Sequence, residues 1–196
     1  MLSSWLNHRL DPIVYKLTPK KSNRAIHPNI LSILGCLTNL ASGVAFAFGH
    51  LFWGGILLLL GGFFDMLDGA VARQESRVTP FGGFLDSVLD RYADQFVLFG
   101  ILIHFARLNQ VLWVILSAIA IIGTTVTPYA RARAENIIDE CHVGILERPE
   151  RVILLAAGAL FGLLTYAIVV VMILSNITVF QRIYHTYKKT ASPSQD

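Results

Sequence analysis

Four aspartates with helical spacing mark the part of the chain where chemistry could take place. Asp65 and Asp68 are three residues apart, and Asp86 and Asp90 are four residues apart. Because residues at these spacings lie on one face of an α-helix, each pair predicts an acidic helix face. The linker between the pairs, RQESRVTP (residues 73–80), is short, so we expect two antiparallel neighbouring helices whose acidic ends meet.

Four carboxylates brought this close together would repel one another and would require positive charge between them. Ligand sets made only of carboxylate oxygens suit hard cations such as Mg²⁺ or Mn²⁺, and four carboxylates are enough for two ions. A centre with two metal ions is a common way to stabilise the attacking and leaving oxygens in phosphoryl transfer. The acidic pattern therefore predicts a site for two divalent ions.

Small residues and an arginine accompany the aspartates on the same helix faces. Gly69, Ala72 and Arg73 continue the first acidic face, and Gly82 and Gly83 precede the second. Small side chains would allow a bulky ligand to approach the backbone between the helices. A single aspartate could instead be a solvated residue at a helix end, or part of an ion pathway in a transporter. The whole set favours a catalytic site.

The remainder of the chain has the composition of a membrane protein. Of its 196 residues, 54% are hydrophobic and only 15% are charged, whereas a soluble domain has roughly 25% charged residues. A helix needs about 20 apolar residues to cross the hydrocarbon core. The apolar runs predict six crossings: two within residues 25–64 with a turn near Gly49 and His50, one each over 84–105 and 111–129, and two from Pro149 to residue 181 with a break at 162–165. We therefore predict an all-α integral membrane protein with six transmembrane helices.

The two ends of the chain complete the predicted organisation. Within residues 1–24, apolar residues recur at helical spacing among polar ones, which predicts an amphipathic helix on the membrane surface, interrupted at Asp11 and Pro12. Residues 25–189 then form the six-helix domain. The polar tail TASPSQD (residues 190–196) is predicted to be disordered.

Basic residues are concentrated on one side of the predicted spans. They lie before the first span, between the second and third, between the fourth and fifth, and after the sixth, whereas the other side has only Arg107. The positive-inside rule then places both termini and the acidic site on the cytoplasmic side of the cell membrane. The net charge of +3 suits anionic lipid headgroups or phosphates, and no aromatic and basic pattern indicates nucleic-acid binding.

The stretch from Asp65 to Asp90 resembles the signature of the CDP-alcohol phosphotransferase (CDP-alcohol phosphatidyltransferase) family, D-x2-D-G-x2-A-R-x8-G-x3-D-x3-D, and matches it at every typed position. The resemblance implies transfer of a phosphatidyl or archaetidyl group from a CDP-linked lipid to an alcohol, with release of CMP. It also agrees with six transmembrane helices and implies a homodimer.

The resemblance also implies roles for the residues of the signature. The two ions, Mg²⁺ or Mn²⁺, would be held by four side chains: Asp65, Asp68, Asp86 and Asp90. Asp90 matches the position of the general base, which would deprotonate the acceptor hydroxyl. The CDP part of the donor would contact a second set: Asp68, Gly69, Ala72 and Arg73.

A second region, residues 129–151, bears on the acceptor alcohol. Its YARARAE and GILERPER stretches resemble the bacterial phosphatidylinositol-phosphate synthases and the archaeal archaetidylinositol-phosphate synthases, whose acceptor is L-myo-inositol 1-phosphate. The resemblance places the acceptor phosphate at three positions, which correspond to Arg131, to Arg148 or Arg151, and to Arg182. The first of these positions is often lysine in that branch and is arginine here, which keeps the charge but changes the geometry.

Several alternatives stay open at this point. A single arginine on the basic side is better explained by anchoring at the membrane surface, and only the clustering of several beside the acidic site favours binding of an anionic acceptor. The same chemistry could use glycerol 3-phosphate, free inositol or serine as the acceptor. A prenyltransferase also uses aspartate-rich helices with Mg²⁺, although Arg73 and the glycines favour the CDP-alcohol family. A cation transporter would use the aspartates as a pathway and would release no CMP.

Overall fold

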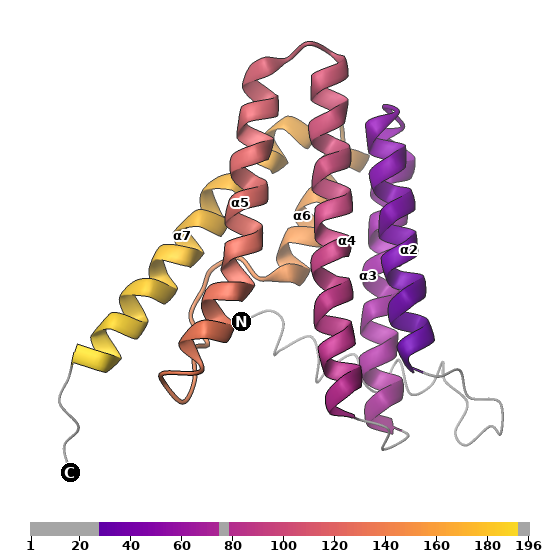
Figure 1. Ribbon diagram of the computed structural model, residues 1–196. Helices are drawn as coiled ribbons and strands as arrows, with labels where there is room; N and C mark the ends of the chain where they lie inside the picture. The colour runs from indigo at the N-terminus through magenta and orange to yellow at the C-terminus, as the bar shows by residue number, and fades with distance from the viewer. Residues whose placement is uncertain (1–27, 75–78, 192–196) are drawn as a thin grey trace.

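The computed structural model describes residues 28–74 and 79–191, which form six α-helices and no strand (Figure 1). In chain order these are α2 (Pro28–Ala47), α3 (Leu51–Gln74), α4 (Pro80–Arg107), α5 (Val111–Ala134), α6 (Arg148–Leu160) and α7 (Leu164–Ala191). The all-helical prediction is confirmed for this part of the chain. The predicted N-terminal amphipathic helix lies outside the described residues, as does the predicted tail from residue 192 onward, while α7 continues through Ala191.

Four of the described helices are long and apolar enough to cross a membrane. They are Pro28–Ala47, Leu51–Arg73, Val111–Ala134 and Leu164–Ala191. The helix α4 has 28 residues but carries charged side chains in its first half, and α6 has only 13 residues. At 1.5 Å per residue α6 is about 20 Å long, shorter than the roughly 30 Å hydrocarbon core. The chain is therefore a multi-pass membrane protein in which each of the six predicted spans is a helix.

Local chemistry explains where several helices begin and end. Gly49 (φ +85°) lies in the turn between α2 and α3, and Gly162 (φ +71°) lies between α6 and α7, in the left-handed region that favours glycine. Both turns confirm positions predicted from the sequence. The helix α4 starts at Pro80, and the hydroxyl of the preceding Thr79 accepts a hydrogen bond from the backbone N–H of Gly82 (3.0 Å).

The helix α2 packs against both α3 and α4, whereas α3 and α4 have almost no direct backbone contact. The α2–α4 contact is closest at two glycines, because a Cβ on Gly43 would overlap the carbonyl of Phe96, and a Cβ on Gly100 would overlap the backbone of Gly43. The prediction that the two acidic helices are direct neighbours is therefore wrong along most of their length. They are antiparallel (Figure 1), and α2, whose small residues allow a close approach, packs against both of them.

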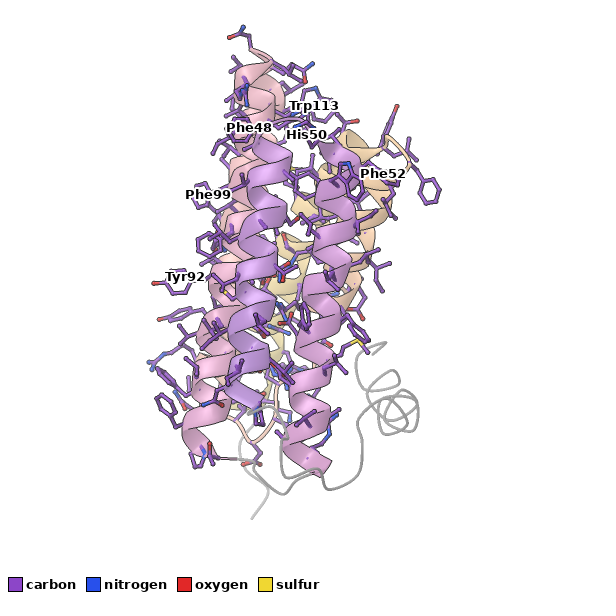
Figure 2. The ribbon with its side chains drawn as sticks, turned by 90° about the vertical axis from the view of Figure 1, so that its right-hand side faces the viewer. Phe48, His50, Phe52, Tyr92, Phe99 and Trp113 are labelled. Atoms are coloured by element: carbon purple, nitrogen blue, oxygen red, sulfur yellow. The ribbon has the colours of Figure 1, made fainter. Side chains whose placement is uncertain are left out.

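The outer surface of the bundle is largely apolar. Aromatic side chains that are about half exposed or more, such as Phe48, Phe52, Tyr92 and Phe99, point away from the helices (Figure 2). The interior contains a separate apolar cluster, whose fully buried members include Phe46, Ile101, Ile168 and Val171. An apolar outer surface of this extent marks contact with lipid.

Candidate active site

The four aspartates of the sequence pattern lie on two helices that approach the same end of the molecule. Asp65 and Asp68 are in the second half of α3, and Asp86 and Asp90 are in the first half of α4 (Figure 1). Asp68 is buried, and the other three are partly buried. Carboxylates withdrawn from water in this way require partners that compensate their charge.

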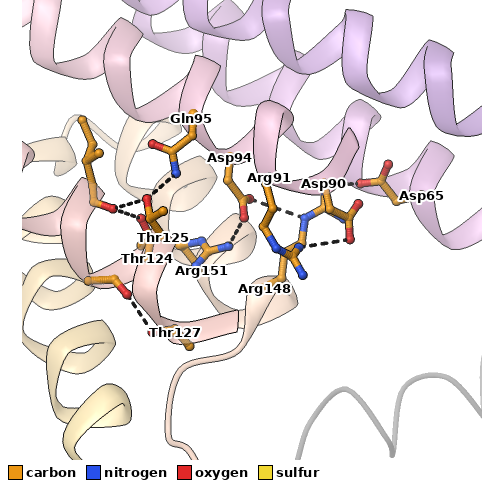
Figure 3. Close-up of polar contacts among 12 residues, drawn as sticks. Asp65, Asp90, Arg91, Asp94, Gln95, Thr124, Thr125, Thr127, Arg148 and Arg151 are labelled. Carbon is orange, nitrogen blue, oxygen red and sulfur yellow. Dashed lines mark hydrogen bonds and ion pairs between the residues drawn. The ribbon is translucent and has the colours of Figure 1, made fainter. Parts of the chain in front are cut away.

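Arg148 supplies positive charge between the two acidic helices (Figure 3). It is the first residue of α6, and its Nη2 lies 2.7 Å from Oδ2 of Asp65 on α3. Its Nη1 lies 2.8 Å from Oδ1 of Asp90 on α4. One guanidinium therefore joins α3, α4 and α6. The sequence predicted that positive charge must lie between the carboxylates, but it did not predict that Arg148 would provide it.

A fifth aspartate, Asp94, belongs to the same cluster and was missed by the sequence reasoning. It lies one turn beyond Asp90 on α4 and is buried. Its carboxylate pairs with the guanidinium of Arg151 and lies 3.4 Å from Nε of Arg148. The i, i+4 spacing of Asp86 and Asp90 continues to Asp94, so extending the periodic search by one turn would have found it.

The donor set of the cluster suits a hard cation, although no metal site is fully assembled. Among the described residues, no three aspartate, glutamate, histidine or cysteine side chains are close enough together to hold a metal ion. Oδ2 of Asp68 is nevertheless buried and has no hydrogen-bond partner in the part of the chain that the structure describes. A buried carboxylate oxygen of this kind is expected to have a partner, and a divalent cation would satisfy it. The residues present therefore fit such an ion by their chemistry.

The other residues of the signature surround Asp68. Gly69 and Arg73 are one turn apart on α3, and a Cβ on Gly69 would lie 3.3 Å from Nη1 of Arg73. Ala72 is partly buried on the same helix. Ser32, at the start of α2, is also buried, and its hydroxyl donates a hydrogen bond to the carbonyl of Pro28 (3.3 Å). Small side chains thus leave space at the end of α3 next to an arginine and a buried carboxylate.

A polar cavity of about 420 Å³ lies beside the aspartates, and all four arginines of the sequence prediction line it. They are Arg131 from α5, Arg148 and Arg151 from α6, and Arg182 from α7. Asp90 reaches the same cavity from α4. The structure therefore brings together residues that are separated by more than 90 positions in the chain. Several fixed cations around one space favour an anionic ligand such as a phosphate.

The arginines of the cavity are held by groups that the sequence did not reveal. Arg182 donates hydrogen bonds to the carbonyls of Thr127 (2.5 Å) and Val143 (2.9 Å). One turn earlier on α7, the hydroxyl of Thr178 accepts hydrogen bonds from the backbone of residues 145 and 146. These contacts fix the loop before α6 against α7. No periodic pattern marks such side chain to backbone contacts, so they could not be read from the sequence.

Arg131 is the most exposed of the four arginines and has acidic neighbours. Its Nε donates a hydrogen bond to Glu135 (2.8 Å), one turn later, and its Nη2 lies 3.0 Å from Nδ1 of His142. The hydrogen bond from Arg131 lowers the pKa of Glu135 below its ordinary value. Glu135 and Arg131 thus form an ion pair at the edge of the cavity.

A second cavity, of about 460 Å³, lies between α3 and α6 and is mainly apolar. Leu59, Phe63 and Ile153 line it and are also exposed on the outer surface of the bundle. Asp90 and Arg148 line this cavity as well as the polar one. A lipid-facing space and an ionic space therefore meet at one carboxylate and one guanidinium, an arrangement suited to a substrate with an apolar part and a charged part.

Two named enzymes are similar to this chain in sequence over most of their length. The archaetidylinositol phosphate synthase of Methanothermobacter thermautotrophicus is 36% identical over 186 residues, which covers 92% of this chain and 89% of the relative. The phosphatidylinositol phosphate synthase of Mycobacteroides abscessus is 37% identical over 167 residues, which covers 80% of this chain and 76% of the relative.

Solved structures of the phosphatidylinositol phosphate synthase of Mycobacterium tuberculosis match the fold. The crystal structure with CDP-DAG bound has a TM-score of 0.80 and 30% sequence identity, and the match covers 95% of this chain and 96% of that one. The complex with manganese and citrate has a TM-score of 0.75 and 28% identity, covering 96% and 90% of the two chains. The family model described as CDP-alcohol phosphatidyltransferase matches residues 25–184. With the complete aspartate signature and a helical membrane fold around it, the chain belongs to the CDP-alcohol phosphatidyltransferase family and is a transferase of phospholipid synthesis.

Proposed function

We propose that the protein transfers a phosphatidyl or archaetidyl group from a CDP-linked lipid to L-myo-inositol 1-phosphate and releases CMP. The observation that carries this proposal is the meeting of an apolar and an arginine-lined cavity at Asp90. Lipid tails fit the first cavity, and a small phosphorylated polyol fits the second. The names of the relatives, which are inositol phosphate synthases with either archaeal or bacterial lipids, support the same acceptor.

In the proposed reaction, the acceptor hydroxyl oxygen attacks the phosphorus atom that carries the lipid. The bond from this phosphorus to the oxygen that bridges the diphosphate breaks, and CMP leaves with that oxygen. Asp90 accepts the proton of the attacking hydroxyl, which its place on the walls of both cavities supports. One phosphorus–oxygen bond forms, one breaks and one proton is transferred to Asp90, so the reaction needs no covalent enzyme intermediate.

The donor diphosphate is proposed to bind at the end of α3. Gly69 and Ala72 have small side chains there, Arg73 contributes positive charge, and Asp68 precedes Gly69 on the same helix. Divalent ions, Mg²⁺ or Mn²⁺, would be held by Asp65, Asp68, Asp86 and Asp90, and when bound they supply charge that stabilises the diphosphate and the leaving CMP. The donor chemistry of the cluster and the buried oxygen of Asp68 support a divalent ion here, as does the manganese complex of the solved relative, and we propose two ions because four carboxylates are enough for two.

The acceptor phosphate is proposed to bind among the arginines of the polar cavity. Arg131 and Arg182 stand on two helices, α5 and α7, with Arg148 and Arg151 on α6 between them and the aspartates. Arginine forks match the oxygens of a phosphate, so this group would fix the inositol ring with one hydroxyl directed at Asp90.

The proposed topology places this site at the cytoplasmic side of the cell membrane. The basic residues Arg73, Arg133 and Lys188 lie on the helix ends that Figure 1 shows at one end of the bundle, whereas Arg107 lies at the other. The positive-inside rule then puts both termini in the cytoplasm. We include α4 and α6 as the remaining two of six crossings, residues 1–24 as a surface helix, and a homodimer as the assembly.

One assay tests the proposal against its rivals. Purified protein is given CDP-lipid and Mn²⁺, and CMP release is measured in parallel with inositol 1-phosphate, glycerol 3-phosphate, free inositol and serine. We expect release with inositol 1-phosphate. Release with glycerol 3-phosphate alone would overturn the proposed acceptor, and metal flux into vesicles without any CMP release would support a transporter. Donors with ester-linked and ether-linked tails, tested side by side, identify the lipid.

A further inference from the structure

Arg148 has contacts that a role in binding the acceptor phosphate does not explain. Its three guanidinium nitrogens are directed at three carboxylates: Nη2 at Asp65 (2.7 Å), Nη1 at Asp90 (2.8 Å) and Nε at Asp94 (3.4 Å). A phosphate entering the polar cavity would meet a guanidinium each of whose three nitrogens already faces a carboxylate. Arg148 lines that cavity all the same, and it lines the apolar cavity as well.

We propose that the Arg148 guanidinium and a divalent cation are alternative partners of Asp65 and Asp90, so that binding of the cation releases Arg148 to the phosphate of the acceptor. The exchange rests on the proposed function and adds to it an order in which the ligands bind. The donor side of the site must load its metal before the acceptor side is complete. Arg148 then acts as a positioning residue that couples the two halves of the site.

Charge and geometry support an exchange over simultaneous binding. A guanidinium and a divalent cation on the same two carboxylates would repel each other strongly at these distances. Asp65 and Asp90 are two of the four carboxylates proposed to hold the cation, and both now face the Arg148 guanidinium. Two positive partners therefore compete for Asp65 and Asp90, and only one can be bound closely at a time.

Asp94 gives the released side chain a place to remain. It contacts Nε of Arg148, and it is itself held by Arg151, which is buried. Loss of the contacts to Asp65 and Asp90 would leave the contact to Asp94 intact. The guanidinium would then turn about this contact toward the polar cavity, whose wall it already forms. The required movement is a side-chain rotation.

The exchange makes binding of metal and binding of phosphate depend on each other. While Arg148 occupies the two carboxylates, the apparent metal affinity is reduced by the fraction of time in which they are available. A phosphate that attracts Arg148 raises the metal affinity, and by thermodynamic linkage the metal raises the phosphate affinity by the same factor.

The first test measures Mn²⁺ binding to purified protein without substrates, by electron paramagnetic resonance of free Mn²⁺. Arg148→Gln removes the competing charge, so we expect its affinity for Mn²⁺ to rise by about tenfold or more. The matched control is Arg131→Gln, which removes one positive charge from the same cavity but has no contact with Asp65 or Asp90. Equal affinities in the two variants would overturn the proposal, because a change in net charge alone would then explain the result.

The second test keeps the proposal falsifiable if Arg148→Gln fails to fold. In wild-type protein, saturating inorganic phosphate should raise the Mn²⁺ affinity, and the absence of any rise would overturn the exchange. Arg148→Lys retains the charge but cannot direct two parallel nitrogens at both carboxylates. We expect its Mn²⁺ affinity to lie above that of wild type and its response to phosphate to be smaller. An unchanged affinity and response in this variant would count against the exchange.

The two hypotheses fail in different ways. CMP release by wild-type protein together with equal Mn²⁺ affinities of Arg148→Gln and Arg131→Gln would refute the exchange and leave the proposed function standing. Absence of CMP release with every acceptor would refute the proposed function. Wild-type protein that binds no Mn²⁺ at all would refute both.

Discussion

Arg151 of α6 and Asp94 of α4 form an ion pair that is almost completely buried. A buried charge left without its partner is strongly destabilising. We therefore expect Asp94→Asn to lower the free energy of unfolding by roughly 3–5 kcal/mol. Thermal unfolding of the purified protein in detergent measures the change. The double variant Asp94→Asn with Arg151→Gln should lose less than the sum of the two single losses, and full additivity would show that the two side chains are not coupled.

Asp90→Asn is expected to remove transfer while leaving donor binding largely intact. The amide keeps the size of the side chain but cannot accept the proton of the attacking hydroxyl, which corresponds to a loss in rate of about 10²–10⁴-fold. CMP release gives the rate, and equilibrium binding of labelled CDP-lipid gives the affinity. Undiminished turnover in this variant would show that another group is the base.

Arg182→Ala should raise the KM for inositol 1-phosphate by about tenfold or more, with a change of less than about twofold in the KM for CDP-lipid. A hydrogen bond from arginine to a charged group contributes about 1.5–3 kcal/mol, and the donor lies outside the reach of this residue in our proposal. Arg133→Ala, an exposed arginine that does not line the cavity, is the matched control with both KM values unchanged. Equal increases for the two substrates would indicate that Arg182 only supports the fold.

Gly43→Ala is expected to destabilise the contact between α2 and α4. Its Cβ would overlap the carbonyl of Phe96, and forced overpacking costs about 1–3 kcal/mol. Gly83→Ala, also in a helix, is the control, since its Cβ would meet nothing within 4 Å of the described residues and alanine favours the helix by up to about 1 kcal/mol. Thermal unfolding compares the two variants. Equal stability would mean that α2 and α4 can separate without cost.

Removal of divalent ions should abolish CMP release. An excess of EDTA is added to active protein, and Mn²⁺ or Mg²⁺ is then returned in excess over the chelator, which should restore the rate. Monovalent salt at the same ionic strength should not restore the rate. It screens the surface charges of the protein equally well, but it does not give the carboxylates a divalent partner. Full activity in EDTA would contradict the proposed metal dependence.

The sequence predicted which segments form helices and which residues share the acidic helix faces, because both depend on local periodicity. The turns at Gly49 and Gly162 and the start of α6 near Pro149 follow from single residues with strong conformational preferences. The same reasoning could not predict that α2 separates α3 from α4. That arrangement depends on how closely two backbones approach at Gly43 and Gly100, a match between helices that neither glycine shows by itself.

The contacts of the arginines could be predicted only in part from the sequence. Their number on one side of the chain and their resemblance to an acceptor-binding branch led to the four residues that line the polar cavity. The sequence could not show that Arg148 reaches Asp65 and Asp90, because a long side chain at a helix start can reach several elements. Asp94 was overlooked for a simpler reason: it lies outside the family signature, although its spacing continues the same face.

The junction of the two cavities has a consequence for how the rate of this enzyme must be described. In the proposed reaction, the donor enters through the apolar cavity between α3 and α6 from the bilayer, where its effective concentration is a mole fraction among other lipids. The proposed acceptor enters from the aqueous phase, where its concentration is molar. Diluting the CDP-lipid with inert lipid at constant bulk amount would thus slow the enzyme, whereas diluting the whole suspension would lower only the supply of the acceptor.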